Sequence, residues 1–183
     1  MAKYTTEEVV FGANCPLPTD AYVVRINDMK KKKSAAGNPM AVTELEIVSP
    51  TSVEVLGKRY ATGGQKVTIF TVLDPSMTFM AQMIEGMKRA NLEPRVVQEL
   101  GEGELFSDEE EDLAKFKGKM LRITIDSQPQ VAMRRPTPEE KAAGIKSEPL
   151  KNPDGTEMVT GYRLQTDWSR VVGPAENTGE NPY

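Results

Sequence analysis

Strict alternation of apolar and polar residues over positions 121–126, in the strand predicted over 119–126, is the strongest constraint on the fold. Leu121, Ile123 and Ile125 occupy every second position, with polar side chains between them. A period of two is that of a β-strand with one face buried and the other in water. The segment therefore predicts a half-buried strand.

Other segments have the same character. Tyr22, Val24 and Ile26 share one face of a segment whose other face holds Val23, Arg25 and Asn27, and a β-branched run follows Lys66. Both patterns are typical of strands. A short hairpin that turns at Gly57 is predicted over residues 53–61. Five main strands are predicted in all, over residues 21–29, 39–48, 66–73, 119–126 and 158–168.

Two helices are predicted between the third and fourth strands. Asp74-Pro75 is typical of a helix start, and Met80, Ile84 and Met87 recur at helical spacing, so a helix is expected over residues 75–90. A capping box that begins at Ser107 predicts a second, short helix through residue 116. The methionines at positions 77, 80, 83 and 87 are interpreted as a packing stripe, and no cofactor is assigned to them.

The connections between these elements differ in length and composition. Residues 30–38 are predicted to form a flexible hairpin loop, and residues 127–157 a long loop between the last two strands. This order of elements is mainly β with one or two helices, and it matches a five-stranded OB-type barrel. We expect one domain over residues 1–172 and a disordered tail over residues 173–183.

Composition excludes several classes of function. The chain has no histidine and a single cysteine, Cys15, which argues against zinc sites and against Ser-His-Asp chemistry. No apolar run is long enough for a membrane span, and a cytoplasmic location is expected. The net charge of −4 gives no indication of a nucleic-acid partner, so the distribution of charge matters more than its sum.

Basic residues gather in the two long connections. Four consecutive lysines in the first connection suit a phosphate backbone, although lysines also keep a sheet edge soluble. The pair Arg134-Arg135 lies in the second connection, where neighbouring glutamates dilute its charge. In an OB barrel these two connections flank the nucleic-acid face, which favours a binding role for both.

Single-strand binding also needs aromatic side chains on which bases can stack. The aromatic candidates are Tyr60, Phe70, Tyr162 and Trp168, and each is as readily a core residue. Phe70 is interpreted as core, whereas Tyr60 is the best exposed candidate because Lys58 and Arg59 precede it.

The acidic run at residues 108–112 could in principle hold a divalent cation. Adjacent carboxylates on a helix point in different directions, however, so a structural or repulsive role is favoured. The glycine pairs have no following Lys-Ser or Lys-Thr, and no phosphate-binding loop is predicted.

Several motifs carry a family resemblance. Ala21-Tyr22-Val23-Val24-Arg25-Ile26, the turn from Lys32 to Met40, Glu44 to Val48, and Phe116-Lys117-Gly118-Lys119 are the segments concerned. They resemble the corresponding segments of phage single-stranded DNA-binding proteins with OB folds. The resemblance implies a replication or recombination accessory protein that coats exposed strands. The end of the chain, with Glu176, Glu180 and Tyr183, is faintly similar to the acidic tails through which bacterial single-strand binders recruit replication or recombination proteins.

The resulting hypothesis is a non-enzymatic, sequence-tolerant binder of single-stranded DNA. It needs no metal or cofactor, and self-association stays open. The expected binding residues are Arg25, Lys30, Lys31, Lys32, Lys33, Lys58, Arg59, Tyr60, Arg134, Arg135 and Tyr162. Two alternatives are a protein-interaction or virion-assembly module and, less favoured, a metal-dependent nuclease that uses the carboxylates of residues 109–112.

Overall fold

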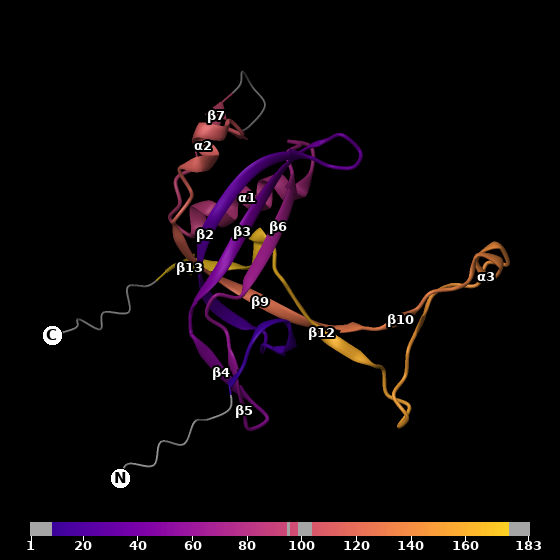
Figure 1. Cartoon of the computed structure of the whole chain (residues 1–183). Coiled ribbons are helices and arrows are strands. Elements are labelled where there is room, and N and C mark those ends of the chain that lie inside the picture. The colour runs from indigo at the N-terminus through magenta and orange to yellow at the C-terminus, as the bar shows by residue number, and fades with distance from the viewer. Residues whose placement is uncertain (1–8, 95, 99–103, 176–183) are drawn as a thin grey trace, which may run out of the picture.

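Strands are the main regular structure of the chain. The computed structural model describes residues 9–94, 96–98 and 104–175 (Figure 1). Its largest sheet has the strand order β12-β9-β2-β3-β6, and β13 also pairs with β9. These strands are β2 (Asp20–Lys33), β3 (Pro39–Ser49), β6 (Lys66–Val72), β9 (Met120–Val131), β12 (Val159–Gln165) and β13 (Val171–Pro174). The mainly β character predicted from the sequence is confirmed.

The alternation of apolar and polar residues along each strand determines which face of this sheet is buried. Val24 lies opposite Ile47 and Ile26 lies opposite Leu45, and all four side chains are buried. On β9, Leu121, Ile123 and Ile125 are fully buried, as the sequence predicts. One face of β2, β3, β6 and β9 therefore supplies the core, and the intervening residues point outward.

The large sheet does not close on itself. In the described part of the chain no hydrogen-bonded pairing joins β6 to β12, the two ends of the strand path. The predicted closed five-stranded barrel is therefore not confirmed, although β6 and β12 do lie in contact. The edges of these two strands border a hollow that is described below.

A smaller sheet lies at the end of the molecule opposite the turn between β2 and β3 (Figure 1). Its strands are β1 (Val9–Val10), β4 (Ser52–Val55) and β5 (Lys58–Ala61). The β4–β5 hairpin confirms the predicted turn at Gly57. Both turn residues have positive φ, 51° at Leu56 and 77° at Gly57, as a two-residue hairpin turn requires.

The backbone of Leu56 lies in the left-handed region, and its side chain is 100% exposed. We expect this backbone conformation to lower the free energy of unfolding. That region costs most side chains roughly 1–2 kcal/mol but is tolerated by Asn. We expect Leu56→Asn to raise the free energy of unfolding by up to about 1 kcal/mol, measured by denaturant titration. Leu56→Ala removes the same exposed side chain without relieving the backbone, so an equal gain from both variants would contradict this explanation.

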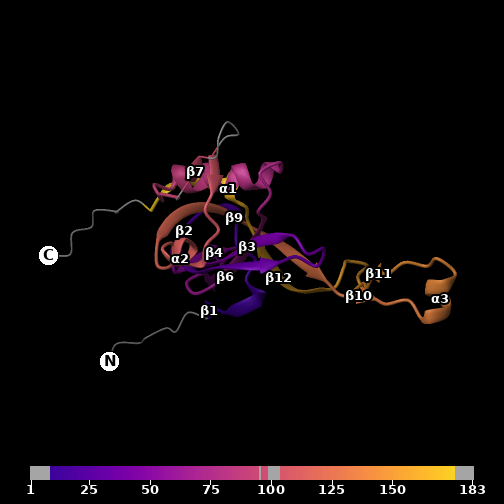
Figure 2. The ribbon, with the colours of Figure 1, turned by 90° about the horizontal axis from the view of Figure 1, so that it is seen from above.

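The predicted first helix is α1 (Thr78–Arg89), which begins three residues later than expected. Asp74 accepts hydrogen bonds from the Ser76 amide at 2.9 Å and the Ser76 hydroxyl at 2.7 Å, so it closes a turn before the helix instead of capping it. Met80, Met83, Ile84 and Met87 are buried, which confirms the packing stripe at these positions, but Met77, which was also assigned to it, is 41% exposed. Figure 2 shows α1 lying along one side of the sheet.

Trp168 packs the segment that follows β12 against α1. This residue begins the short 3-10 helix η2 (Trp168–Arg170), is 1% exposed and packs against α1 at Gly86. The Arg89 guanidinium donates to the Val171 carbonyl at 2.8 Å, which ties the last turn of α1 to β13. The predicted fifth strand at residues 158–168 therefore ends earlier, at Gln165, and the chain continues as η2 and β13.

The predicted capping box at Ser107 is wrong. The second helix, α2 (Glu110–Ala114), has Glu109 at its N-cap without a side-chain cap. The Ser107 hydroxyl donates instead to a carboxylate oxygen of the buried Asp112 at 2.6 Å. The remaining short elements of the body are η1 (Gly12–Asn14), β7 (Val96–Gln98) and β8 (Glu104–Phe106).

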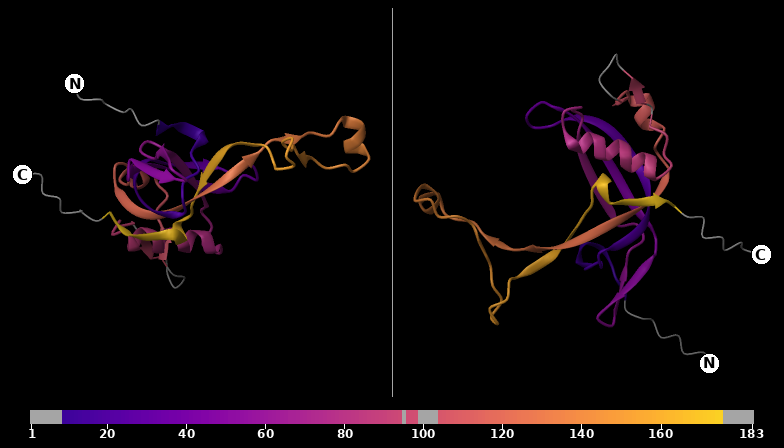
Figure 3. Two further views of the ribbon diagram at one scale, coloured as in Figure 1. Left: turned by 90° about the horizontal axis from the view of Figure 1, so that it is seen from below. Right: turned by 180° about the vertical axis from the view of Figure 1, so that it is seen from behind.

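The long loop predicted over residues 127–157 contains regular structure. β9 continues to Val131, and β10 (Met133–Arg134), α3 (Pro138–Ala142) and β11 (Glu148–Pro149) follow. The α3 helix is a third helix, where one or two helices were predicted. We call residues 131–159 the arm, because they project far from the rest of the molecule (Figure 3).

The predicted disordered tail, residues 173–183, lies only partly within the described residues. Gly173 belongs to β13 and is not disordered, whereas residues 176–183 lie outside the described residues. Within the described residues, no helix combines the length and the apolar character needed to cross a membrane.

Candidate nucleic-acid interface

The four lysines lie in a strand and not in the predicted flexible loop. Lys30 to Lys33 are the last residues of β2 and pair with the first four residues of β3, from Val42 back to Pro39. The turn is confined to residues 34–38, where the Ser34 amide donates to the Asn38 carbonyl at 2.8 Å. Strand pairing continues through the lysines because an exposed hairpin end can hold charged side chains on both faces.

Because they lie in a strand, the lysines point to two different faces. Lys31 pairs with Ala41, which is fully buried, so Lys31 and Lys33 lie on the core side of the hairpin. Lys30 pairs with Val42 and Lys32 with Met40, so these two lysines lie on the outer side. The run therefore does not act as one cluster of four charges on one surface.

The ion-pair partners of the lysines differ between the outer side and the core side of the hairpin. On the outer side, the Lys30 amine lies 2.7 Å from an Asp28 carboxylate oxygen, and this hydrogen bond raises the pKa of Lys30 and lowers that of Asp28. On the core side, Lys31 forms an ion pair with Asp108. Among the described residues, Lys32 and Lys33 have no ion-pair partner.

Cross-strand register places an aromatic ring beside the outer lysines. Val42 pairs with Phe70 on β6, so Lys30, Val42 and Phe70 form one row across the outer face. The next row toward the turn is Lys32, Met40 and Val72. Phe70 is 59% exposed, which corrects its interpretation as a core residue. We call this surface of β2, β3 and β6 the outer face.

A hollow of about 490 Å³ adjoins the outer face where the edges of β6 and β12 meet. Phe70 and Tyr162 both line it, so rings from two strands face one space. Lys66 and Arg163 add positive charge at its border. The other lining residues are Gly12, Gln65, Val67, Thr68, Gln130 and Leu164.

Carboxylates on the outer face neutralise part of its charge. The Arg25 guanidinium lies 2.6 Å from Glu46, and this hydrogen bond holds the pKa of the Glu46 carboxyl below its ordinary value. The Lys66 amine lies 3.1 Å from Glu44. Arg25, which the sequence predicted to bind directly, is thus engaged within the sheet, whereas the exposed Arg163 has no ion-pair partner among the described residues.

The turn between β2 and β3 and the arm extend from the same side of the molecule (Figures 1 and 3). This agrees with the expected placement of the two basic connections. The Arg134 guanidinium, however, lies 3.2 Å from Glu140. The pKa of Glu140 is lowered first by the hydrogen bond from the Thr137 amide and then by Arg134. The Arg134 guanidinium is therefore already paired with a carboxylate of the arm.

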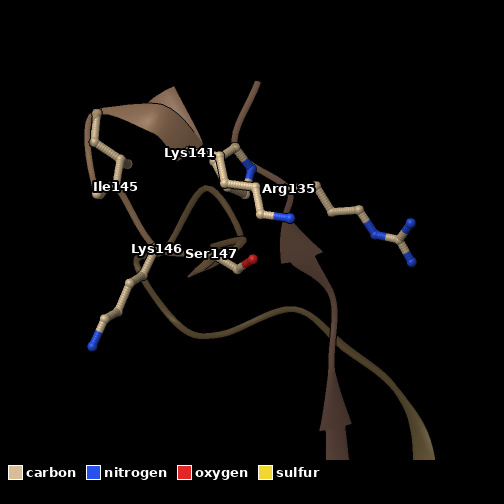
Figure 4. A pocket seen from close by; sticks show the side chains of 7 residues that line it. Arg135, Lys141, Ile145, Lys146 and Ser147 are labelled. Carbon is tan, nitrogen blue, oxygen red and sulfur yellow. The ribbon is translucent and has the colours of Figure 1, made fainter. Parts of the chain in front are cut away.

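Arg135 lies at the far end of the arm, beside a second hollow of about 550 Å³. Lys141 and Lys146 also line this hollow, together with Pro136, Gly144, Ile145 and Ser147. Figure 4 shows that the charged ends of Arg135 and Lys146 point in opposite directions. The three cations do not converge on one point, so the arm does not form a clamp around a single phosphate.

Lys58, Arg59 and Tyr60 lie on β5, in the small sheet. This sheet is at the opposite end of the molecule from the lysine hairpin (Figure 1). Tyr60 is half-buried and packs against the core. The structure therefore does not bring these three predicted binding residues together with the outer face.

The acidic run does not form a metal site among the described residues, where no cluster of three or more metal-ligating side chains occurs. Asp112 is buried and accepts hydrogen bonds from Ser107 and from Lys115, the latter at 3.0 Å. The side chains of residues 109–111 are exposed.

Phe70, Lys66 and Arg163 were not among the predicted binding residues, although Phe70 was one of the aromatic candidates. A signal for two of them was present in the alternation of β6. Val67, Ile69 and Thr71 are buried, so the positions between them must share the outward face. Arg163 had no comparable signal, because its role depends on where β12 lies relative to β6.

No protein-family model matches the sequence, and no curated protein matches it.

Proposed function

We propose that this protein binds single-stranded DNA along the outer face of β2, β3 and β6 and in the hollow between β6 and β12. The observation that supports this most is that Phe70 and Tyr162 line the same hollow, which Lys66 and Arg163 also line. Exposed rings next to cations are the combination that holds unpaired bases and their phosphates together.

The order of the strands supports an OB-type architecture for this proposal. Numbered along the chain as strands one to five, the path β12-β9-β2-β3-β6 reads five, four, one, two, three. In an OB fold, strands two and three present the nucleic-acid face, and here these are β3 and β6. The outer face therefore lies where such a fold would place its ligand.

Binding would proceed without bond chemistry. Lysine and arginine side chains release counterions from the phosphates, and the aromatic rings stack against bases of any sequence. Phe70 supports this function through its position, because it is exposed on the outer face and lines the hollow. The resemblance of residues 21–48 and 116–119 to phage single-strand binders extends the proposal to phage DNA replication or recombination in the host cytoplasm.

Two of the four lysines lie on the outer face and two on the core side, so two double variants of equal charge can test whether DNA binds the outer face. We expect Lys30→Gln combined with Lys32→Gln to weaken binding of a labelled single-stranded oligonucleotide. The slope of log affinity against log salt should flatten by about 0.7 for each phosphate that the protein no longer neutralises. Fluorescence anisotropy at several salt concentrations measures both quantities.

The control is Lys31→Gln combined with Lys33→Gln, which makes the same change in net charge on the core side of the same hairpin. We expect this variant to bind nearly as well as the natural protein. Equal losses from the two double variants would contradict a site on the outer face and would indicate a diffuse electrostatic effect.

A further inference from the structure

A row of carboxylates crosses the middle of the outer face. Asp28 on β2 lies opposite Glu44 on β3, and Thr68 on β6 completes the row. The neighbouring rows on either side begin with Lys30 and with Arg25, so cations border the carboxylates on both sides. Two carboxylates directly opposite each other destabilise a sheet, and the bordering cations compensate for this repulsion.

Three ion pairs form on the outer face as a result, each between one cation and one carboxylate. They join Arg25 to Glu46 at 2.6 Å, Lys30 to Asp28 at 2.7 Å and Lys66 to Glu44 at 3.1 Å. We call them the outer ion pairs. Three of the cations that would meet a phosphate at this surface are therefore already neutralised by the protein itself.

The outer ion pairs are open to solvent. Their cationic side chains are 49–66% exposed, and their carboxylate side chains are 21–40% exposed. Water and salt screen such pairs, so that each one changes an equilibrium constant by about fivefold or less. A phosphate that approaches the same cation can therefore take the place of the carboxylate.

Two other cations beside the site are not paired in this way. Lys32 and Arg163 have no ion-pair partner among the described residues, so each can neutralise a phosphate outright. A cation of an outer ion pair instead exchanges one anion for another, and the displaced carboxylate stays close and repels the phosphate. Charge therefore adds little to binding at these positions, and stacking on Phe70 and Tyr162 contributes the larger share.

We propose that the three carboxylates of the outer ion pairs determine the specificity of the site, because they compete with phosphates for its cations. Every nucleic acid has to break these pairs, whereas only unpaired bases gain the stacking that offsets their loss. A duplex is affected most, because its charge density is higher and it cannot stack on the rings. This inference rests on the proposed binding of single-stranded DNA at the outer face.

Glu44→Gln combined with Glu46→Gln tests the proposal, because it preserves the size of both side chains and frees two cations. We expect this double variant to bind a labelled single-stranded oligonucleotide about 4-fold to 25-fold more tightly than the natural protein. The slope of log affinity against log salt should steepen by about 0.7 for each freed cation that neutralises a phosphate. Affinity for the corresponding duplex should rise by a larger factor, so the preference for the single strand should fall. Fluorescence anisotropy measures all three quantities.

The matched control is Glu85→Gln combined with Glu93→Gln. It makes the same change in net charge at exposed positions on and after α1, which packs against the buried face of the sheet. Salt screens charges at this remove, so the control should change the affinity by no more than about twofold.

The outcomes separate this inference from the proposed function. If the natural protein binds single-stranded DNA but the Glu44 and Glu46 variant gains no more affinity than the control, the competition is overturned and the proposed function stands. An unchanged ratio of single-strand to duplex affinity in that variant would also overturn the role in specificity. If neither the natural protein nor the variant binds single-stranded DNA at low salt, both proposals fail.

Discussion

Replacing Gly86 with alanine is expected to destabilise the protein by about 1–3 kcal/mol, the usual range for overpacking a tight contact. A Cβ at this position would lie 2.5 Å from the Trp168 carbonyl oxygen, which belongs to the backbone and cannot rotate away. The effect has the opposite sign to helix propensity, because glycine to alanine inside a helix normally gains up to about 1 kcal/mol. Thermal or denaturant unfolding measures the change.

The control for this prediction is Glu85→Ala, at the neighbouring exposed position of α1. It should change stability by no more than roughly 0.5 kcal/mol. If Gly86→Ala proved as stable as the natural protein or more stable, the close packing of α1 on η2 would be contradicted. If that variant did not fold in buffer alone, a stabilising osmolyte, added equally to the natural protein and to both variants, would bring its stability into the measurable range.

Replacing both Phe70 and Tyr162 with alanine should produce the largest loss of single-stranded DNA affinity. Stacking contributes roughly 1–3 kcal/mol for each base, so each ring removed should weaken binding by about 5-fold to 150-fold. The loss should persist at high salt, because stacking does not depend on counterion release, and the salt slope should stay nearly unchanged. Anisotropy titrations of the single and double variants measure these quantities.

Phe79 provides a matched control for the aromatic variants. It is 60% exposed, against 59% for Phe70, but it lies on α1 and not on the outer face. Phe79→Ala removes an equally exposed ring and should leave the affinity within about twofold. A comparable loss from Phe79→Ala, or no loss from Phe70→Ala, would contradict stacking in the hollow between β6 and β12.

Much of the sheet could be predicted from the sequence, because alternation records burial directly. Residues 119–126 and 39–48 have clear periods of two, and both segments are strands with the expected buried face. The methionine stripe of α1 was predictable for a related reason, since helical spacing also reports one buried side. Local patterns of this kind depend only on which side of an element faces the core.

The predictions from the sequence were wrong where the structure depends on contacts between distant segments and not on the burial of one side of an element. Lys30 to Lys33 have no apolar alternation, and they lie in a strand because residues 39–42 pair with them. The arm has no buried residue, so its strands and its helix produced no periodic signal. The Gly86–Trp168 contact joins residues far apart in the chain, and no local pattern could indicate it.

The candidate site was only partly predictable for the same reason. The lysine hairpin and Tyr162 were identified by residue type, but their relation to Phe70 follows from cross-strand register and from the approach of β12 to β6. Lys58, Arg59 and Tyr60 were grouped with the site because they interleave cations with an aromatic ring. Their placement in a separate sheet depends on how β4 and β5 leave the main sheet.

The most direct test of the central claim is an anisotropy titration that compares a labelled single-stranded oligonucleotide with the corresponding duplex at two salt concentrations. The proposed site predicts tighter binding of the single strand at both concentrations, because the rings of Phe70 and Tyr162 can stack only on unpaired bases. Raising the salt should weaken both complexes but should not abolish the preference. Equal affinity for the two forms, or no binding to either at low salt, would contradict the proposed function.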